Sequence, residues 1–155
     1  MMLIVAVGLK QPSWVAEAFA DYLGRFPPEI RPLLREIKAE PRTSGKTVAA
    51  MKQAEAERIE AAIPKGGVRI ALDERGRALT TSELAALIDR IRMETSDIAF
   101  VIGGPDGLDD DFKSRCQHQL RLSSMTLPHG MVRALLAEQL YRAWSISTGH
   151  PYHRE

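Results

Sequence analysis

Short apolar runs alternate along this chain with longer segments of helical periodicity. Five short runs have the length of β-strands, and they cover residues 3–7, 33–39, 68–73, 97–104 and 119–124. Apolar side chains recur at helical spacing at about 13–25, 47–63, 80–93, 108–115 and 131–148, with a turn expected at 75–78. Largely apolar strands that alternate with helices are typical of parallel sheets covered on both faces. The pattern therefore predicts one α/β domain over residues 1–155, with a mostly parallel sheet and helices on both faces.

The composition is that of an ordinary globular chain, with 45% hydrophobic and 26% charged residues and a formal net charge of +1. This charge excludes a global signature of polyanion binding. No apolar run approaches the length of a membrane span, and the first residues lack a basic start and a cleavage site, so we expect a cytoplasmic protein. A single cysteine, Cys116, excludes internal disulfides, and with His118 alone beside it we expect a buried or incidental thiol and no metal site.

The types and positions of the positively charged residues are more informative than the net charge. The chain has 15 arginines against 6 lysines, and arginine is the side chain best suited to forked contacts with phosphates and bases. Residues 121–155 hold four of these arginines, two acidic residues and three of the four histidines. We therefore expect the C-terminal quarter to meet a polyanion or a polar ligand.

The segment TSGKT at 43–47 resembles the end of a phosphate-binding P-loop. That motif requires glycine five residues before Gly45, where this chain has Glu40 followed by Pro41. A carboxylate at that position would repel the negative charges of a bound triphosphate. We interpret the segment as a basic loop, and a P-loop-like nucleotide hydrolase remains only as an alternative.

Two further segments combine small residues with a strand end. In FVIGGPDGL (100–108), glycines follow a buried strand and precede a helix, where open α/β sheets bind ligands because glycine lets the backbone approach the ligand. Ile102 stands where the dinucleotide fingerprint requires glycine. LRLSSMTLPHG (120–130) repeats the arrangement, although its hydroxyls could equally satisfy a turn. Together with LDERG (72–76) after the third strand, these segments predict a shared crevice.

The last predicted helix is apolar almost all the way round, so we expect it to be a core helix that also meets a partner subunit. It nevertheless retains Arg133 and Arg142, which raises the possibility of a charged ligand. The alternative for Arg142 is a plain ion pair with Glu138, four residues earlier. The chain then ends on HPYHRE (150–155), which is rich in hydrogen-bonding side chains.

In this order, the segments resemble the RlmH family, the small SPOUT-class methyltransferases that act on a pseudouridine in large-subunit ribosomal RNA. The resemblance spans the chain and lies in VGL (7–9), LDERGRALTTSEL (72–84), FVIGGPDGL, LSSMTLPHGMVRALLAEQLYRAW (122–144) and HPYHRE. It implies a C-terminal part threaded as a trefoil knot, a homodimer, and S-adenosyl-L-methionine as the cofactor. In the family the cofactor is held mainly by backbone groups, which suits loops poor in charge. The implied cofactor-binding residues are Leu72, Gly103, Gly104, Leu122, Ser123, Ser124, Met125, Thr126 and Leu127.

The implied reaction is methyl transfer to N3 of a pseudouridine in 23S rRNA. The nitrogen must lose its proton to expose a lone pair, so a positioned base or a nearby cation would assist, although water could serve. The candidate catalytic residues are His129, Arg133, Arg142, Tyr152, His153 and Arg154, with Tyr152 as a platform for a base. The near-neutral charge favours the assembled ribosome as the substrate. A non-catalytic RNA-binding module remains an alternative.

Overall fold

The computed structural model describes residues 1–8, 10–43 and 45–154, and five strands of this chain form one sheet. The strands are β1 (Met2–Val7), β2 (Leu33–Ile37), β3 (Val68–Ala78), β4 (Ile98–Ile102) and β5 (His118–Arg121). Between and after them lie α1 (Ser13–Gly24), a short 3-10 helix (Pro28–Ile30), α2 (Val48–Ala62), α3 (Thr81–Glu94), α4 (Asp110–Arg115) and α5 (His129–Thr148). The strand order is β2-β1-β4-β3-β5, and every pairing is parallel. The predicted α/β class with a parallel sheet is confirmed.

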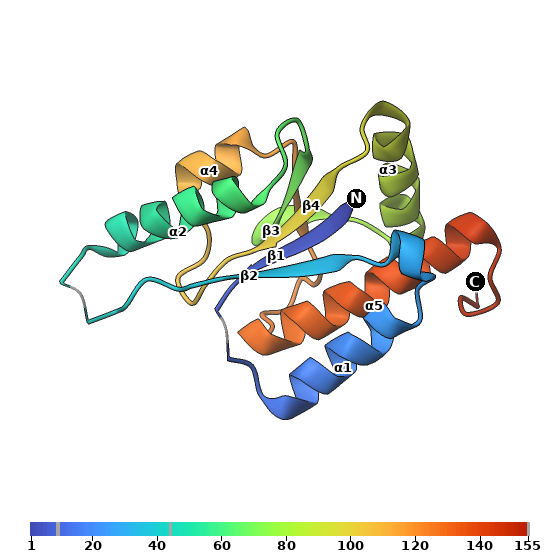
Figure 1. Cartoon of the computed structure of the whole chain (residues 1–155), viewed down its shortest axis with the longest axis horizontal. Coiled ribbons are helices and arrows are strands. Elements are labelled where there is room, and N and C mark those ends of the chain that lie inside the picture. The colour runs from blue at the N-terminus through green and yellow to red at the C-terminus, as the bar shows by residue number, and fades with distance from the viewer. Residues whose placement is uncertain (9, 44, 155) are drawn as a thin grey trace.

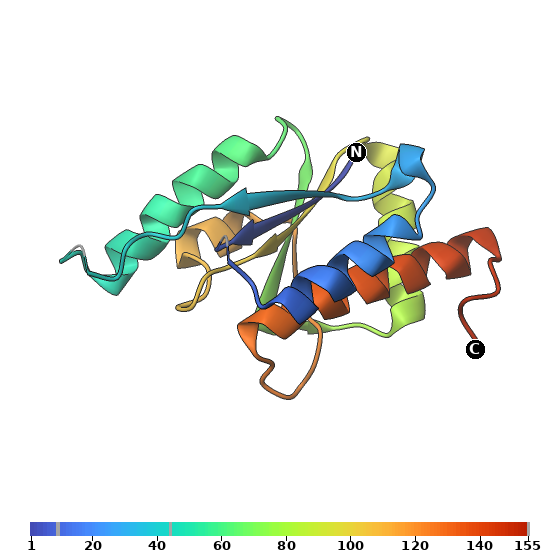
Figure 2. The ribbon, with the colours of Figure 1, turned by 60° about the horizontal axis from the view of Figure 1, so that its bottom comes forward.

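Helices cover both faces of the sheet (Figure 1). Helices α2 and α4 lie on one face, while α1, α3 and α5 lie on the other, as the turned view also shows (Figure 2). Strand β1, which lies between β2 and β4, is buried along its whole length, because alternate side chains enter the two layers. Ile4 points into the core beneath α1, α3 and α5, whereas Leu3 and Val5 point into the core beneath α2 and α4. This placement explains the unbroken apolar run at the start of the chain.

Helix α5 belongs to the larger of the two cores, as its sequence predicted. Leu136, Ala137 and Leu140 are buried there, and α5 packs against α1 and α3. Trp144 is only partly buried at the edge of this core. None of the helices in the described parts of the chain is both long and apolar enough to cross a membrane. The knotted threading and the contact of α5 with a partner subunit stay predictions.

The third strand departs from the sequence-based expectation. The turn expected at 75–78 is wrong, because β3 continues to Ala78 and pairs with β5 on both sides of an irregularity. Leu120 of β5 is the partner of both Leu72 and Arg77, so residues 73–76 bulge out of the ladder. Bulges of this kind re-aim side chains next to functional sites. Here the bulge brings three consecutive charged residues to the carboxyl end of the sheet.

Glycine at position 76 is required by the close approach of two backbones at this bulge. A Cβ atom on Gly76 would lie 2.5 Å from the carbonyl carbon and 2.7 Å from the nitrogen of Leu120. Real Cβ atoms essentially never approach backbone atoms this closely. Any side chain at position 76 would therefore push β3 and β5 apart.

We predict that Gly76→Ala destabilises the fold by about 3 kcal/mol or more, because the overlap involves backbone rather than a side chain that could move. The matched control is Gly24→Ala at the end of α1, where an added Cβ would meet nothing within 4 Å. The control should stabilise the helix by about 0.5–1 kcal/mol. Urea unfolding followed by circular dichroism measures both variants. Equal stability of the two variants would contradict the close approach.

Candidate active site

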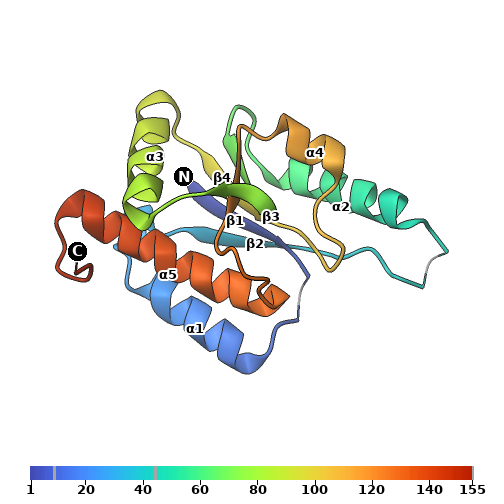
Figure 3. The same cartoon turned by 180° about the vertical axis from the view of Figure 1, so that it is seen from behind.

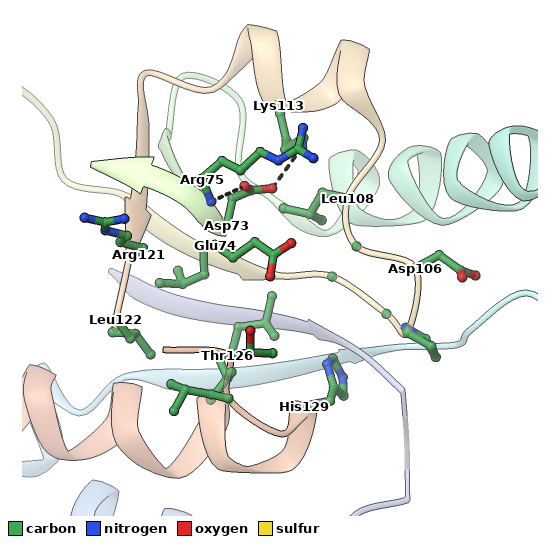
Figure 4. Close-up of a pocket in the computed structure, with 18 of the residues that line it drawn as sticks. Asp73, Glu74, Arg75, Asp106, Leu108, Lys113, Arg121, Leu122, Thr126 and His129 are labelled. Atoms are coloured by element: carbon green, nitrogen blue, oxygen red, sulfur yellow. Dashed lines mark hydrogen bonds and ion pairs between the residues drawn. The ribbon is translucent and has the colours of Figure 1, made fainter. Parts of the chain in front are cut away.

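A cavity of about 650 Å³ opens at the carboxyl ends of β3, β4 and β5. Its walls come from the bulge at 72–75, the loop at 102–108 and the loop at 121–127, with contributions from α2, α4 and α5 (Figure 4). These are the three segments that the sequence predicted to share a crevice. Eight of the nine predicted cofactor-binding residues line the cavity: Leu72, Gly103, Gly104, Leu122, Ser123, Met125, Thr126 and Leu127. Ser124 is exposed and lies outside the lining.

The glycine loop at 103–107 is tightly folded on itself. The amide of Gly107 donates to the carbonyl of Gly104 at 3.0 Å, and Gly107 has a φ of 83°. A Cβ on Gly103 would lie 2.8 Å from the carbonyl carbon of Gly107, and one on Gly104 would lie 3.1 Å from Cγ1 of Val7. These added atoms would meet protein rather than the open cavity. The glycines are thus required by the packing of the loop, and the close approach of a ligand to their backbone stays a prediction.

A buried carboxylate connects the glycine loop to helix α2. Glu55 is 1% exposed, accepts a hydrogen bond from the amide of Glu40 at 2.9 Å, and pairs with Arg42 at 3.2 Å. Arg42 in turn contacts Asp106 of the glycine loop at 2.9 Å. Because Arg42 bridges two acids, one of them buried, it holds the loop against the start of α2.

The segment TSGKT does not form a free phosphate-binding loop in the part that the structure describes, which excludes Ser44. Lys46 pairs with the buried carboxylate of Glu40 at 2.6 Å, and Arg58 pairs with the other oxygen at 2.6 Å. Hydrogen bonds from Lys46 and then from Arg58 lower the pKa of Glu40. Thr47 accepts a hydrogen bond from the amide of Ala50 and so caps α2. Lys46 is therefore committed to a structural ion pair, which argues against the nucleotide hydrolase.

Charged residues on the β3 bulge form one wall of the cavity, and the expectation of charge-poor loops is wrong there. Asp73 pairs with Lys113 of α4 at 2.9 Å and accepts a hydrogen bond from the amide of Arg75 at 2.8 Å. Glu74 points into the cavity (Figure 4), and Arg121 lines its other side. The run DERGR directly after an apolar strand was the signal that could have indicated these residues.

His129 is the one candidate catalytic residue that lines the cavity. It begins α5, and its Nε2 lies 3.3 Å from the carbonyl oxygen of Val7. Since a carbonyl oxygen only accepts, Nε2 must carry the hydrogen in this contact. In the neutral ring, Nδ1 then has the lone pair of a potential base.

Arg133 lies one turn further along α5 but is turned away from the cavity. It is 3% exposed, pairs with Glu36 of β2 at 2.9 Å, and donates to the carbonyl of Gly8. These contacts join the start of α5 to the ends of β1 and β2. Arg133 thus positions the helix that carries His129.

The remaining candidates, Arg142, Tyr152, His153 and Arg154, are not among the residues that line the cavity. The chain continues past the end of α5 that is remote from His129 and turns back there (Figure 3). Within one chain, the tail therefore does not form part of the cavity wall. The structure brings these residues near one another instead: Arg142, Tyr152, His153 and Arg154.

The tail folds back along α5 as far as the middle of that helix. The hydroxyl of Tyr152 donates to Glu138 at 3.1 Å, and the guanidinium of Arg142 lies 5.0 Å from the ring centre of Tyr152. Arg142 also donates to Glu138 through Nε at 2.9 Å, as the ion-pair alternative predicted. Burial, followed by the neighbouring Tyr22 and Glu138, raises the pKa of Tyr152 to about 12. Tyr152 is thus a neutral hydrogen-bond donor at physiological pH.

His153 contacts Ser145, whose hydroxyl donates to the carbonyl of Arg142 at 2.7 Å. Nδ1 of His153 lies 3.1 Å from that hydroxyl oxygen and must act as the donor, because the serine hydrogen is already used. Nε2 of the neutral ring then carries the lone pair. Arg154 is exposed, and Glu155 of the predicted tail lies outside the described residues.

Cys116 is partly buried, and burial raises the pKa of its thiol to about 11. Its thiol donates to the carbonyl of Phe112 at 3.4 Å. Across the described residues, no three His, Cys, Asp or Glu side chains are grouped so that they could hold a metal ion.

We predict that Lys113→Met lowers stability at pH 7 by about 1–3 kcal/mol, because it leaves the Asp73 carboxylate partly buried without its cation. Burial raises the pKa of Asp73, but the hydrogen bonds from Lys113 and the amide of Arg75 outweigh it, so the folded pKa lies below the ordinary value. The pair therefore stabilises the fold above pH ~4, and this stabilisation is lost as the pH falls through the folded pKa.

The difference in stability between Lys113→Met and the unmutated protein should accordingly become smaller in acid, because Asp73 becomes protonated in both. Urea unfolding at pH 7 and in acid measures this difference. The control is Arg115→Met, which removes an exposed pair with Asp111 on the same helix and should cost less than about 1 kcal/mol. A pH-independent loss in Lys113→Met would contradict the role of this ion pair.

Comparison with known proteins places the chain in a family. A family model described as "Predicted SPOUT methyltransferase" matches residues 1–153. Ribosomal RNA large subunit methyltransferase H from Bordetella petrii is 59% identical over 153 residues, covering 99% of this chain and 98% of the relative. The protein of the same name from Ralstonia pickettii is 61% identical over 153 residues, with the same coverage.

Solved structures share the fold at low sequence identity. A probable methylase family protein from Haemophilus influenzae superposes with a TM-score of 0.56 at 15% identity, over 99% of this chain and 70% of that one. A probable methyltransferase from Bordetella pertussis gives a TM-score of 0.57 at 17% identity, over 92% and 95% of the two chains. From the full-length match and the high identity to its curated relatives, the chain belongs to the SPOUT methyltransferases, in the family of ribosomal RNA large subunit methyltransferase H.

Proposed function

We propose that this protein transfers a methyl group from S-adenosyl-L-methionine to N3 of a pseudouridine in 23S rRNA, in the cytoplasm and on the assembled ribosome. The observation that carries the proposal is the cavity of about 650 Å³ at the ends of β3, β4 and β5, in a chain whose relatives are named as large-subunit rRNA methyltransferases. The pseudouridine target comes from the family resemblance. The alternative of a non-catalytic RNA-binding module would leave this cavity without a role.

The residues present fit the cofactor. The cavity volume of about 650 Å³ lies within the range of small-molecule sites. Apolar side chains from β3, β4, the last loop and α5 suit an adenine ring: Leu72, Ile102, Leu122, Leu127 and Val132. Glu74 and Asp106 add carboxylates that suit ribose hydroxyls and a positive sulfonium. When bound, S-adenosyl-L-methionine supplies an electrophilic methyl group.

The residues of the chain have two tasks in this reaction. They must align the nucleotide nitrogen with the methyl group, and they must accept the N3 proton or stabilise the anion that its loss creates. His129 is the base candidate at the cavity, since its Nε2 donates to Val7 and its Nδ1 is left with the lone pair. His153 is the second candidate, through Nε2, and water is the third.

We further propose that the protein is a homodimer in which the tail of one protomer completes the cavity of its partner. No residue of the tail is among those that line the cavity of its own chain. The side chains in the tail and beside it on α5 are suited to a nucleotide: Tyr152 as a stacking platform, and Arg142, His153 and Arg154 as hydrogen-bond donors. The incompletely buried face of α5 supports contact with a second copy.

The substrate proposal predicts methyl transfer only where pseudouridine is present. Ribosomes, isolated large subunits and free 23S rRNA would be incubated with the protein and labelled cofactor. The same particles from cells lacking the pseudouridine synthase would serve as the control. We expect incorporation to be greatest in assembled ribosomes, with a reverse-transcription stop at the modified base, because an N3 methyl group blocks pairing. Equal methylation of the uridine-containing control would contradict the proposal.

Deletion of residues 150–155 should leave affinity for the cofactor within about twofold while reducing methylation by about a hundredfold or more. The tail lies away from the cavity but would supply contacts to the target base in the dimer. Calorimetry with S-adenosyl-L-methionine measures the first quantity, and primer extension on treated ribosomes measures the second. Normal methylation by the truncated protein would show that the tail is not part of the catalytic site.

A mixing experiment tests whether the tail acts between protomers. Val132→Trp would fill the cavity but leave the tail intact, because Val132 lines the cavity near the start of α5. Heterodimers of this variant with the tail-deleted chain contain one intact cavity and one intact tail on opposite protomers. Activity should therefore return on mixing. Continued inactivity, with heterodimers present, would show that the tail serves its own chain.

A further inference from the structure

Four arginines gather along the outer edge of the sheet, next to the cavity. Arg75 and Arg77 are exposed on the last part of β3, Arg121 is on β5, and Arg90 is on α3. Strand β5 is the edge strand, and its Arg121 pairs in register with Ala78, the neighbour of Arg77. Figure 3 shows this part of β3 beside β5. We call these four residues the arginine edge.

Acids compensate the arginine edge only weakly in the part of the chain that the structure describes, where Asp73 acts electrostatically on Arg75 without forming an ion pair with it. Thirteen ion pairs occur among the described residues, and none of them includes Arg75, Arg77, Arg90 or Arg121. Nε of Arg121 is buried and makes no hydrogen bond. The exposed acid on this strand, Glu74, points into the cavity instead, whereas Arg121 points away from the Asp73–Lys113 pair (Figure 4).

Two of these positive charges act on the same nearby side chain. The pKa of His118, at the start of β5, is lowered first by burial and then by the charges of Arg90 and Arg77. Like charges gathered outside ion pairs repel one another in the free protein, and a polyanion bound across them relieves that repulsion. Arginine is also the side chain that forms forked hydrogen bonds with phosphate groups.

We propose that the arginine edge binds the phosphodiester backbone of the RNA strand that carries the target nucleotide and leads this strand into the cavity. Arg75 and Arg121 line the cavity, whereas Arg77 and Arg90 lie outside the lining, so the four residues form a path that ends at the site. This inference rests on the proposed function and assigns its substrate contact. A protein strand is the poorer occupant, because β5 offers only four residues for added strand pairing.

The test removes the two charges that lie outside the cavity lining. The double variant Arg77→Gln/Arg90→Gln would be compared with the unmutated dimer in binding a fluorescent RNA hairpin that contains the target pseudouridine. We expect the affinity for RNA to fall about tenfold at moderate salt, and the slope of log Kd against log salt concentration to fall by about 1.4, because two phosphate contacts are lost. KM for ribosomes should rise with kcat unchanged, and the affinity for S-adenosyl-L-methionine should not change.

The matched control is Lys65→Gln/Arg92→Gln, which removes the same charge from positions outside the arginine edge. Lys65 precedes β3 and Arg92 lies in the last turn of α3. Both are exposed and take part in none of the described ion pairs. This control should bind RNA with nearly unchanged salt dependence.

Different results would overturn the arginine edge and the proposed function. An unchanged RNA affinity and salt slope in Arg77→Gln/Arg90→Gln would overturn the arginine edge, as would an equal loss in the control or a parallel loss of cofactor affinity. Failure of the unmutated protein to methylate any ribosomal substrate would instead overturn the proposed function. The hairpin measurement requires no methylation, so the two failures are distinguishable.

Discussion

The pairing of one residue of β5 with two residues of β3 is the constraint on which the site depends. Leu120 faces both Leu72 and Arg77, and the four residues between them leave the ladder. Only a glycine at position 76 lets the two backbones come together there. Because β5 ends beside this bulge, the loops that follow β4 and β5 open into the same space. The ion pair of Asp73 with Lys113 then ties the bulge to α4.

The elements that the sequence predicted correctly are those determined by local pattern. The first strand is buried on both faces, so its apolar run was unbroken and its assignment held to within one residue. The helices showed their periodicity, and Thr80 caps α3 through a capping box with Glu83. The crevice followed from a general rule, since ligands meet parallel sheets at the carboxyl ends of the strands.

The features that the sequence did not reveal depend on distant partners. Residues 75–78 have the composition of a turn, and only their pairing with Leu120 returns them to a strand. We expected Arg133 to contact a charged ligand, because no partner for it was evident nearby in the sequence. Its partner Glu36 is 97 residues away. Likewise, the burial of Glu55 within α2 depends on Glu40 and Arg42, which precede that helix and contact its carboxylate. The distance between tail and cavity follows from the direction of α5, which periodicity does not specify.

The contacts of Arg133 limit how early the protein can fold during translation. This side chain binds Glu36 and Gly8, which are translated long before it, and the neighbouring Leu136 and Leu140 complete the larger core. The contacts of the first two strands with α5 therefore form only after this last helix has been synthesised. Contacts this far apart in sequence slow folding. Completion of the native state thus requires that α5 has left the exit tunnel.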